Sequence, residues 1–308
     1  MSELTIRALT PRDAEATFTA LPDGSVGAQL LGRPYALREN GGQYRAEWTF
    51  VAERAGTVVA RAAFWAGPEE NEPRVLDWFD VAPGEEAAGT RLLSEIPVRA
   101  EYELVLPPGW REEPGARAEA EARMGAAQAA GYVPLVERYR YRWRSADGLP
   151  ELRPGRLVFE SGPDDEAVLD VLRRVEQGTL DAHGARAVAE GGVEQAAREE
   201  LEFFHWMDSP RAWWQLAYTP GGELVGLHVP GRNPHGPIVG FLGVVPEERG
   251  RGYGYDLLAA CTHVLVAEGA TQIDAATDTG NLPMAASFAR AGYPVIQHRF
   301  CMTAPPGV

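Results

Sequence analysis

Lysine is missing from this sequence altogether, so all 29 of its basic residues are arginines. Walker-type phosphate loops, Schiff-base enzymes and protein kinases each depend on a lysine amine, and the absence excludes all three classes. Cysteine is almost as scarce. Cys261 and Cys301 lie far apart in apolar surroundings and support neither a disulfide framework nor a four-ligand zinc site. The six histidines show no paired spacing such as His-Glu-x-x-His, so no metal site is predicted.

Long apolar runs and an excess of positive charge are also lacking. No stretch approaches the ~20 apolar residues that cross a bilayer, and the N-terminal MSELTIRALTPRD lacks the plan of a signal peptide. We therefore expect a cytoplasmic protein that does not bind membranes. The formal net charge of −15 argues against nucleic acid as a partner. It would attract cationic small molecules, although solubility is the simpler explanation of the charge.

The chain contains two copies of one pattern. The segment Gly131 to Trp143 (GYVPLVERYRYRW) resembles Gly292 to Met302 (GYPVIQHRFCM), and two further pairs of segments match in the same order. Matched blocks at a fixed order indicate an internal duplication. The polar, turn-rich stretch between the copies, Arg144 to Gly155, predicts a boundary between domains 1–147 and 148–308.

Apolar periodicity predicts a mixed α/β domain in the second copy. The expected order is a strand, two helices, three strands, a helix, a strand, a helix and a final strand at Val295 to Met302. The apolar run Ile238 to Val245 is typical of a buried central strand.

The sequence between Val244 and Leu258 (VVPEERGRGYGYDLL) is the richest local signal. A strand ends there, and a turn with two arginines and three glycines leads directly into a helix. Glycines let several N–H groups point into one hollow, and the helix adds its unpaired N–H groups and positive dipole end. Such an assembly suits a diphosphate. The spacing of Gly250 and Gly252 fails the Rossmann fingerprint, because the third glycine and the ribose-binding acid are not in place.

Strand, Arg-x-x-Gly-x-Gly and helix together resemble the signature of the GCN5-related N-acetyltransferases, which use acetyl-CoA. The block Thr277 to Tyr293 is similar to the family's next strand, its asparagine loop at Asn281 and the helix that ends in Gly292-Tyr293. The resemblance covers about residues 156 to 303. It implies two tandem domains of this family, each a mixed, mostly antiparallel sheet flanked by helices, with the first copy degraded.

In this family the cofactor's pantetheine arm lies between two splayed strands. The resemblance implies that Val244 and Val245 contact this arm through backbone groups, that the turn binds the pyrophosphate, and that Asn281 contacts the cofactor. A tyrosine usually follows the asparagine by seven residues and protonates the leaving thiolate, but Phe288 stands there. The cofactor-binding residues expected are Val244, Val245, Arg249, Gly250, Arg251, Gly252, Tyr253, Gly254 and Asn281.

The catalytic residues stay open at this level. Tyr253, Tyr255 and Tyr293 are near in sequence, but aromatic residues of this kind more often pack in a core. His205, Asp208 and His228 are candidate bases, each with a structural role as the simpler interpretation. Five glutamates could face a cationic amine or simply form a solvated helix face: Glu190, Glu194, Glu199, Glu200 and Glu202.

At the matching turn of the first copy, Asp80 to Leu93, the arginine and the paired glycines are lost. Glu85 and Glu86 stand where a diphosphate needs positive charge, so we expect no acetyl-CoA site there. The predicted function is an acyltransferase that moves acetyl from acetyl-CoA to a primary amine by direct attack in a ternary complex. A noncatalytic acyl-CoA-binding or regulatory module is the alternative. The expected partner is a small amine, with the protein a monomer or a homodimer.

Overall fold

The computed structural model describes residues 3–67 and 69–306, and the chain divides into two compact units. Unit 1 consists of Met1–Glu137 and Gln297–Val308, and unit 2 of Arg138–Ile296. The predicted boundary within Arg144 to Gly155 thus differs from the division observed, which cuts the chain at two places. The cause is that the last strand of each half belongs to the other half's unit.

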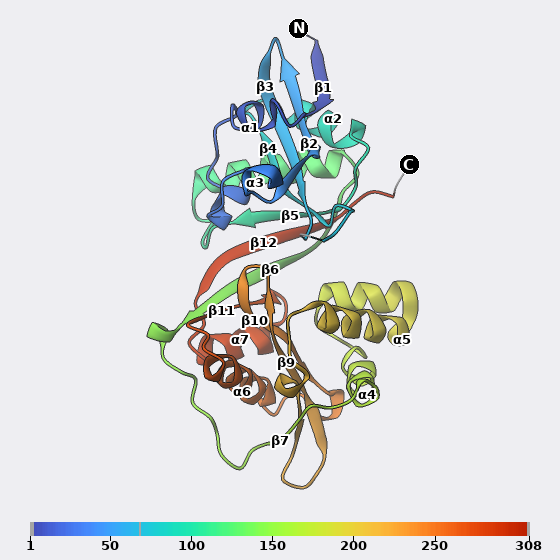
Figure 1. The fold of residues 1–308 in the computed structure, drawn as a ribbon, viewed down its shortest axis with the longest axis vertical. Helices are drawn as coiled ribbons and strands as arrows, with labels where there is room; N and C mark the ends of the chain where they lie inside the picture. The colour runs from blue at the N-terminus through green and yellow to red at the C-terminus, as the bar shows by residue number, and fades with distance from the viewer. Residues whose placement is uncertain (1–2, 68, 307–308) are drawn as a thin grey trace. The chain divides into compact units, whose positions relative to one another are not determined.

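Unit 2 has a six-stranded mixed sheet in the order β7-β8-β9-β10-β11-β6 (Figure 1). Neighbouring strands are antiparallel except β10 and β11, which are parallel. This confirms the predicted mixed α/β architecture. The strands are β6 (Val133–Arg144), β7 (Val158–Ser161), β8 (Gln215–Tyr218), β9 (Leu224–Asn233), β10 (Gly236–Val244) and β11 (Gln272–Asp278). The helices are α4 (Asp165–Val175), α5 (Ala182–Trp206), α6 (Tyr253–Ala267) and α7 (Leu282–Arg290), with 3₁₀ turns η4 (Arg211–Trp213) and η5 (Pro246–Glu248).

The helices of unit 2 cover the two faces of its sheet. Asp164 is the N-cap of helix α4, where its Oδ1 accepts from the Ala167 N–H at 2.9 Å, and the apolar stripe of the helix includes Val168 and Leu172. That stripe packs with α5 on one face of the sheet, and α6 and α7 pack on the other. Helix α5 is kinked at Gly192, where φ is +80°.

Unit 1 repeats this topology, with the strand order β1-β2-β3-β4-β5-β12 and a parallel pair formed by β4 and β5. Its strands are β1 (Leu4–Ala8), β2 (Tyr44–Arg54), β3 (Thr57–Trp65), β4 (Val75–Val81), β5 (Glu101–Leu106) and β12 (Val295–Thr303). Its helices are α1 (Ala14–Phe18), α2 (Glu86–Glu95) and α3 (Pro114–Ala129), with 3₁₀ turns η1 (Ala28–Leu31) and η2 (Arg38–Asn40). A further 3₁₀ turn, η3 (Ser145–Asp147), follows β6 in unit 2.

The two halves of the chain exchange their last strands. Residues 138–144 of β6 pair with β11 in unit 2, from Arg138↔Asp278 to Arg144↔Gln272. Residues 298–302 of β12 pair with β5 in unit 1. The sequence prediction of a strand at Val295 to Met302 is confirmed, but the prediction that it closes the second domain is wrong, because it pairs with β5 of unit 1. The two segments are the most similar pair of the repeat, so their local pattern fits either sheet.

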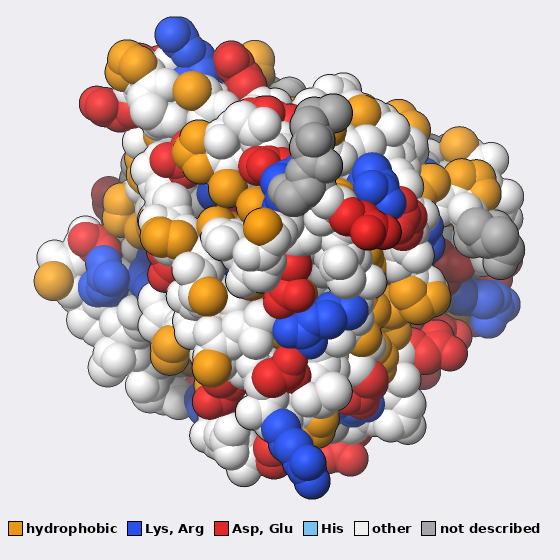
Figure 2. Space-filling model, turned by 90° about the horizontal axis from the view of Figure 1, so that it is seen from above, with side chains coloured by type: hydrophobic (Ala, Val, Ile, Leu, Met, Phe, Trp, Pro, Cys, Tyr) orange, Lys and Arg blue, Asp and Glu red, His pale blue; other side chains and the backbone are white. Residues whose placement is uncertain are grey.

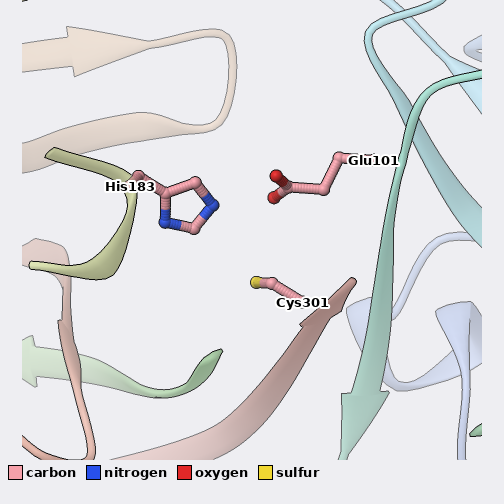
Figure 3. Close-up of side chains that lie close together, drawn as sticks. All are labelled: Glu101, His183 and Cys301. Carbon is pink, nitrogen blue, oxygen red and sulfur yellow. The ribbon is translucent and has the colours of Figure 1, made fainter. Parts of the chain in front are cut away.

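Close packing accompanies the pairing of β12 with β5. Glu101 and Cys301 lie on one face of these two strands, and the Cys301 Sγ is within 4.8 Å of a Glu101 carboxylate oxygen (Figure 3). Cys301 is completely buried, and the two cysteines of the chain, both in the described part, are not joined to each other. The strand that arrives from the far end of the sequence is thus an integral part of the unit 1 core.

The charges on the surface are mixed. On the face shown in Figure 2, acidic and basic side chains are interspersed with uncharged and hydrophobic ones. Among the residues described, no helix is both long and apolar enough to span a bilayer.

Candidate functional site

The parallel strands β10 and β11 separate soon after they meet. Ile238 and Asp274 are their registered pair, and β10 is irregular between Val239 and Phe241. Gly240 sits in that bulge, where a Cβ would come within 2.8 Å of the Val229 carbonyl oxygen. Beyond the bulge β10 follows β9 and leaves β11, which opens a gap in the middle of the sheet.

Backbone groups of β10 face this gap. The Val245 N–H donates to the Val225 carbonyl on β9 at 2.9 Å, so it points away from β11. Because successive residues of an extended chain point to opposite sides, the Val244 N–H points toward the gap. Of the two valines predicted to contact a ligand, Val244 faces the gap, whereas Val245 is buried and bonded to β9.

A cavity of about 720 Å³, which we call the turn cavity, extends from the gap to the start of α6. Seven of the nine residues predicted to bind the cofactor line it, and Val245 and Arg251 do not. Its remaining wall is provided by α7 and the chain after α4. The lining residues are Val175, Thr179, Leu180, Leu242, Gly243, Val244, Glu248, Arg249, Gly250, Gly252, Tyr253, Gly254, Tyr255, Leu257, Asn281, Pro283, Met284, Ala286, Ser287 and Arg290.

The glycine turn places a bare helix terminus on the turn cavity. Gly250 and Gly252 have φ of +80° and +77°, a region that favours glycine. Gly252 is the N-cap of α6 and has no side chain to bond the first N–H groups of the helix. These groups have no intrahelical acceptor, and the dipole makes the terminus positive, so it is suited to an anion.

Arg249 has a structural role that the sequence did not reveal. Its guanidinium donates to four backbone carbonyls, those of Val175 (2.7 Å), Gly178 (2.8 Å), Gln177 (3.3 Å) and Val244 (3.1 Å). The first three lie at the C-terminal end of α4, where a cation is favourable. Arg249 therefore ties α4 to the glycine turn, with most of its donors already used.

Two arginines at the supposed interdomain linker, Arg153 within it and Arg156 directly after it, brace the same turn. Arg153 bonds the Asp256 carboxylate at 2.6 Å and the Gly252 carbonyl at 3.0 Å, and Arg156 bonds the Arg251 carbonyl at 2.8 Å. Asp256 itself is buried in the first turn of α6. The segment that separates the two copies in sequence thus supports the anion site. No local motif marks these residues.

Two further arginines lie near the turn. The exposed Arg290, at the end of α7, lines the turn cavity and stacks over Tyr255, and sequence reasoning missed it. Arg251 points elsewhere and pairs with Glu248 at 2.9 Å. Positive charge therefore surrounds the helix terminus from three segments of the chain.

Asn281 stands at the start of α7, and Phe288 lies within this helix. Asn281 is the N-cap of α7, where its Oδ1 accepts from the Met284 N–H at 3.3 Å. Phe288 is buried and stacks on Tyr141, with ring centroids 4.2 Å apart. Two of the three nearby tyrosines have hydroxyl partners, because Tyr255 donates to the Glu151 carbonyl and Tyr293 bonds Thr262, whereas the half-buried Tyr253 lines the turn cavity with Arg156 over its ring. This agrees with a packing role for them.

A second cavity of about 600 Å³, which we call the acidic cavity, adjoins the first. It lies on the α5 side of the opened sheet and combines acidic, basic and aromatic side chains. The lining residues are Arg138, Arg140, Val175, Glu176, Thr179, Asp181, His183, Gly184, Ala187, Ala196, Glu199, Glu200, Phe203, Asn233, Ile238, Val239, Gly240, Phe241, Leu242, Asp274, Ala275, Ala276, Thr277, Asn281, Met284 and Phe288.

Of the five predicted glutamates, Glu199 and Glu200 line the acidic cavity. The other three lie on exposed helix surface: Glu190 pairs with Arg186, Glu194 with Arg173 and Arg198, and Glu202 is exposed. The solvated-face interpretation holds for these three.

The predicted bases His205, Asp208 and His228 line neither cavity. His205 is exposed, and its Nε2 lies 3.3 Å from the Asp165 Oδ2. His228 is completely buried on β9, with its Nε2 2.8 Å from the Gln215 Oε1. The structural interpretation of these residues therefore fits, and burial lowers the pKa of His228 to about 3.

His228 is expected to make folding sensitive to acid. Because its pKa is about 3 when folded and about 6.5 when unfolded, the unfolded chain takes up the proton first as the pH falls. The free energy of unfolding should fall by about 1.4 kcal/mol per pH unit between about pH 6 and 4 from this group. His228→Gln should remove that slope in urea titrations, whereas His205→Gln should keep it. Parallel curves for wild type and His228→Gln would contradict the assignment.

Unit 1 has a gap of the same kind, but its own chain closes it. Strands β4 and β5 pair at Val75↔Glu101 and Leu76↔Tyr102 and then separate. Further along β5, the Val105 carbonyl accepts the Gly27 N–H at 2.8 Å. A Cβ on Gly27 would lie 3.2 Å from the Asp80 Oδ1 on β4, so the segment before η1 contacts both separated strands.

The turn of unit 1 also differs in charge. Glu85, which precedes α2, is held by Arg54 at 2.9 Å, and no arginine stands at the place of Arg249. The described part of unit 1 therefore lacks both the open strand edge and the basic turn of unit 2.

Comparison with known proteins shows which of them share these features. Residues 182–293 match the model of the acetyltransferase (GNAT) family. A GCN5-related N-acetyltransferase from Sphaerobacter thermophilus superposes on 99% of this chain and 97% of its own, with a TM-score of 0.55 and 17% identity. A GCN5-related glucosamine N-acetyltransferase region in a fungal multi-domain GH3 β-N-acetylglucosaminidase matches 98% of this chain and 38% of its own, with a TM-score of 0.57 and 14% identity.

No curated protein sequence matches the chain. The structures nevertheless share its fold, which is that of GCN5-related N-acetyltransferases. The family match lies entirely within unit 2, and it includes the glycine turn and Asn281.

Proposed function

We propose that this protein is an N-acetyltransferase with one cofactor site, which transfers acetyl from acetyl-CoA to a primary amine. The observation that carries the proposal is the gap between β10 and β11, which runs directly into the glycine turn at the start of α6. An extended thioester with a diphosphate at one end fits a slot of this form, because the slot offers backbone bonds along one wall and an anion site at its end.

The diphosphate would bind the N–H groups from Gly250 to Gly254. The glycine turn, the uncapped helix and the arginine brace all favour negative charge there. Arg290 is suitably placed for a further phosphate, because it lines the turn cavity from the opposite helix. Arg249 supports the site indirectly by fixing α4 to the turn.

The reacting end would lie where the two cavities meet. The Val244 N–H faces the gap, and a backbone donor of β10 would polarise the thioester carbonyl as its oxygen becomes negative. Asn281 is at the same junction, with its amide NH₂ group available to a ligand. The amine would enter from the acidic cavity and attack directly, so that catalysis is mainly orientation and removal of a proton.

Unit 1 would be a second, degraded copy of the domain that does not bind acetyl-CoA. The Gly27 N–H occupies the carbonyl on the edge of β5 that would face a pantetheine arm, and the turn lacks basic residues. We also propose that the two units are tandem domains of one family and that the protein is cytoplasmic.

A noncatalytic acyl-CoA-binding module is the second candidate. The observation that favours it is Phe288, which is stacked on Tyr141 and has no hydroxyl to protonate a leaving thiolate. Release of CoA that depends on an amine would exclude this candidate.

Calorimetric titration of wild-type protein with acetyl-CoA tests the proposal. We expect one site per chain, followed by release of CoA thiol in the presence of a suitable primary amine. Two sites per chain would refute the degraded role of unit 1. Absence of binding to folded protein would refute the acetyltransferase proposal itself.

A further inference from the structure

The two cavities of unit 2 share a common wall. Five residues line both of them: Val175, Thr179, Leu242, Asn281 and Met284. A group bound in the acidic cavity near this wall would therefore be next to the reacting end of a cofactor bound in the turn cavity. The side chains that carry charge at this wall decide which acceptor fits.

Glu176 is the charged residue next to the shared wall. It follows Val175 at the end of α4, where its side chain lines the acidic cavity, and the residue is 6% exposed. Its Oε2 is buried without a hydrogen-bond partner among the residues described. A buried carboxylate oxygen normally accepts a hydrogen bond. The Glu176 Oε2 is therefore suited to accept one from a donor that comes with a ligand.

Glu200 lines the same cavity as Glu176 and lies near enough to sense its charge. It lies on the part of α5 that follows the kink at Gly192, and no ion pair with it is present among the described residues. Burial, followed by the nearby Glu176 and Asp181, raises the pKa of Glu200 to about 8, against a smaller opposing effect of Arg138. Burial also raises the pKa of Glu176, with Asp181 adding to it and Arg249 opposing it.

The other charged groups that face the pair already have partners. Arg138 forms ion pairs with Asp181 and Asp278, each at 3.0 Å, and Asp274 is paired with Arg142 at 2.7 Å. Glu199 accepts from Gln195 at 2.7 Å. Arg140 and His183 also line the cavity and interact with other residues. Among the described residues, no ion pair is formed by Glu176 or Glu200, so a cation that enters the cavity finds both carboxyl groups without one.

We propose that Glu176 and Glu200 form a carboxylate pair that binds the ammonium group of a cationic primary amine and accepts one of its protons. The apolar part of the amine would pack against Phe203 and Phe241, which line the same cavity. This inference rests on the proposed function, because it assigns the acceptor and the base of that reaction. It selects cationic amines over neutral acceptors of the same shape.

The proton and bond balance is simple. The ammonium gives one proton to the carboxylate pair, and the amine nitrogen then attacks the thioester carbon. A C–N bond forms and the C–S bond breaks. The sulfur leaves as thiolate and takes the second proton, which the nitrogen loses on becoming an amide. The pair finally releases its proton to solvent, so that one proton is liberated per turnover.

Binding of matched ligands tests the charge requirement. Protein saturated with CoA is titrated with a panel of primary amines, such as benzylamine and the diamine putrescine, each beside its hydroxyl analogue. The best amine should bind at least tenfold more tightly than its alcohol. The double variant Glu176→Gln/Glu200→Gln should lose this preference, and Glu202→Gln, which is outside both cavities, should keep it.

Two results of the binding test would overturn the inference. One is a preference for amines that survives in the double variant, and the other is an absence of any amine preference in wild type. In both cases, titration of the same samples with acetyl-CoA shows whether the proposed function itself still holds. Binding of acetyl-CoA should stay within twofold in the double variant, and its loss in wild type would instead refute the proposed function.

A second measurement needs no acceptor. A carboxyl group whose pKa is higher in the folded state stabilises the fold at low pH and loses this contribution as the pH rises toward its folded pKa, here between about pH 4.5 and 8. The melting temperature of wild type should therefore fall across this range more than that of Glu200→Gln.

With an active amine, Glu200→Gln should lower kcat by at least a hundredfold and flatten the rise of kcat/KM with pH. Equal profiles for the two proteins would refute the role of Glu200.

Discussion

Replacing Gly252 with Glu is expected to weaken acetyl-CoA binding at least a hundredfold. Gly252 has φ of +77° at the start of α6, and its Cβ position is open toward the cavity. A glutamate there would place a carboxylate where the diphosphate is to bind, and like charges repel. Its side chain could also bond the free N–H groups of the helix and so compete with the ligand. Calorimetry with acetyl-CoA measures the loss.

Gly269→Glu is the matched control, because it lies just past the other end of the same helix. Gly269 has φ of +86° and equally open surroundings, so both substitutions carry the same backbone strain of about 1–2 kcal/mol. Both variants should lose similar free energy of unfolding, while only Gly252→Glu loses acetyl-CoA. Equal affinities in the two variants would remove the glycine turn from the site.

Asp80→Asn is expected to cost about 3–5 kcal/mol of unfolding free energy in unit 1. Asp80 is buried on β4 between two buried arginines, with its oxygens 2.7 Å from Arg61 and 2.8 Å from Arg123. It also accepts the Trp78 indole N–H at 2.7 Å. Asparagine removes the negative charge and leaves two guanidinium groups without adequate compensation in the core. Urea unfolding with a probe of unit 1 measures the cost.

Asp23→Asn provides the comparison for this network. Asp23 also pairs with Arg61, at 2.6 Å, but its side chain is 56% exposed. Solvent screens such a pair, so its loss should cost no more than about 1 kcal/mol. If the two variants were equally stable, the buried charges would not hold unit 1 together.

The sequence predicted what depends on local pattern. Apolar periodicity, helix signals and the glycine turn lie within short windows, and the structure confirms the mixed sheet and the helix after the turn. The internal repeat also corresponds to two units with one strand order. These features need no knowledge of distant partners.

What the sequence could not show are contacts between distant segments. The carbonyls that engage Arg249 belong to the backbone, which leaves no residue signature. Arg153 stands in a stretch that is typical of a linker, and Arg156 directly follows it. Glu200 could not be separated from its neighbours on the helix until the kink at Gly192 and the cavity were known. The strand exchange was invisible because both segments carry the same pattern.

That exchange has a consequence for the order in which the protein is made. Unit 1 needs β12, which is encoded about 190 residues after β5. At about 5–20 residues per second, a ribosome takes roughly 10–40 s to reach it. Throughout this time the edge of β5 stays without its neighbour, and an open strand edge invites pairing with other chains. The half that emerges first is therefore completed last, and a nascent chain stalled before residue 295 would be prone to association.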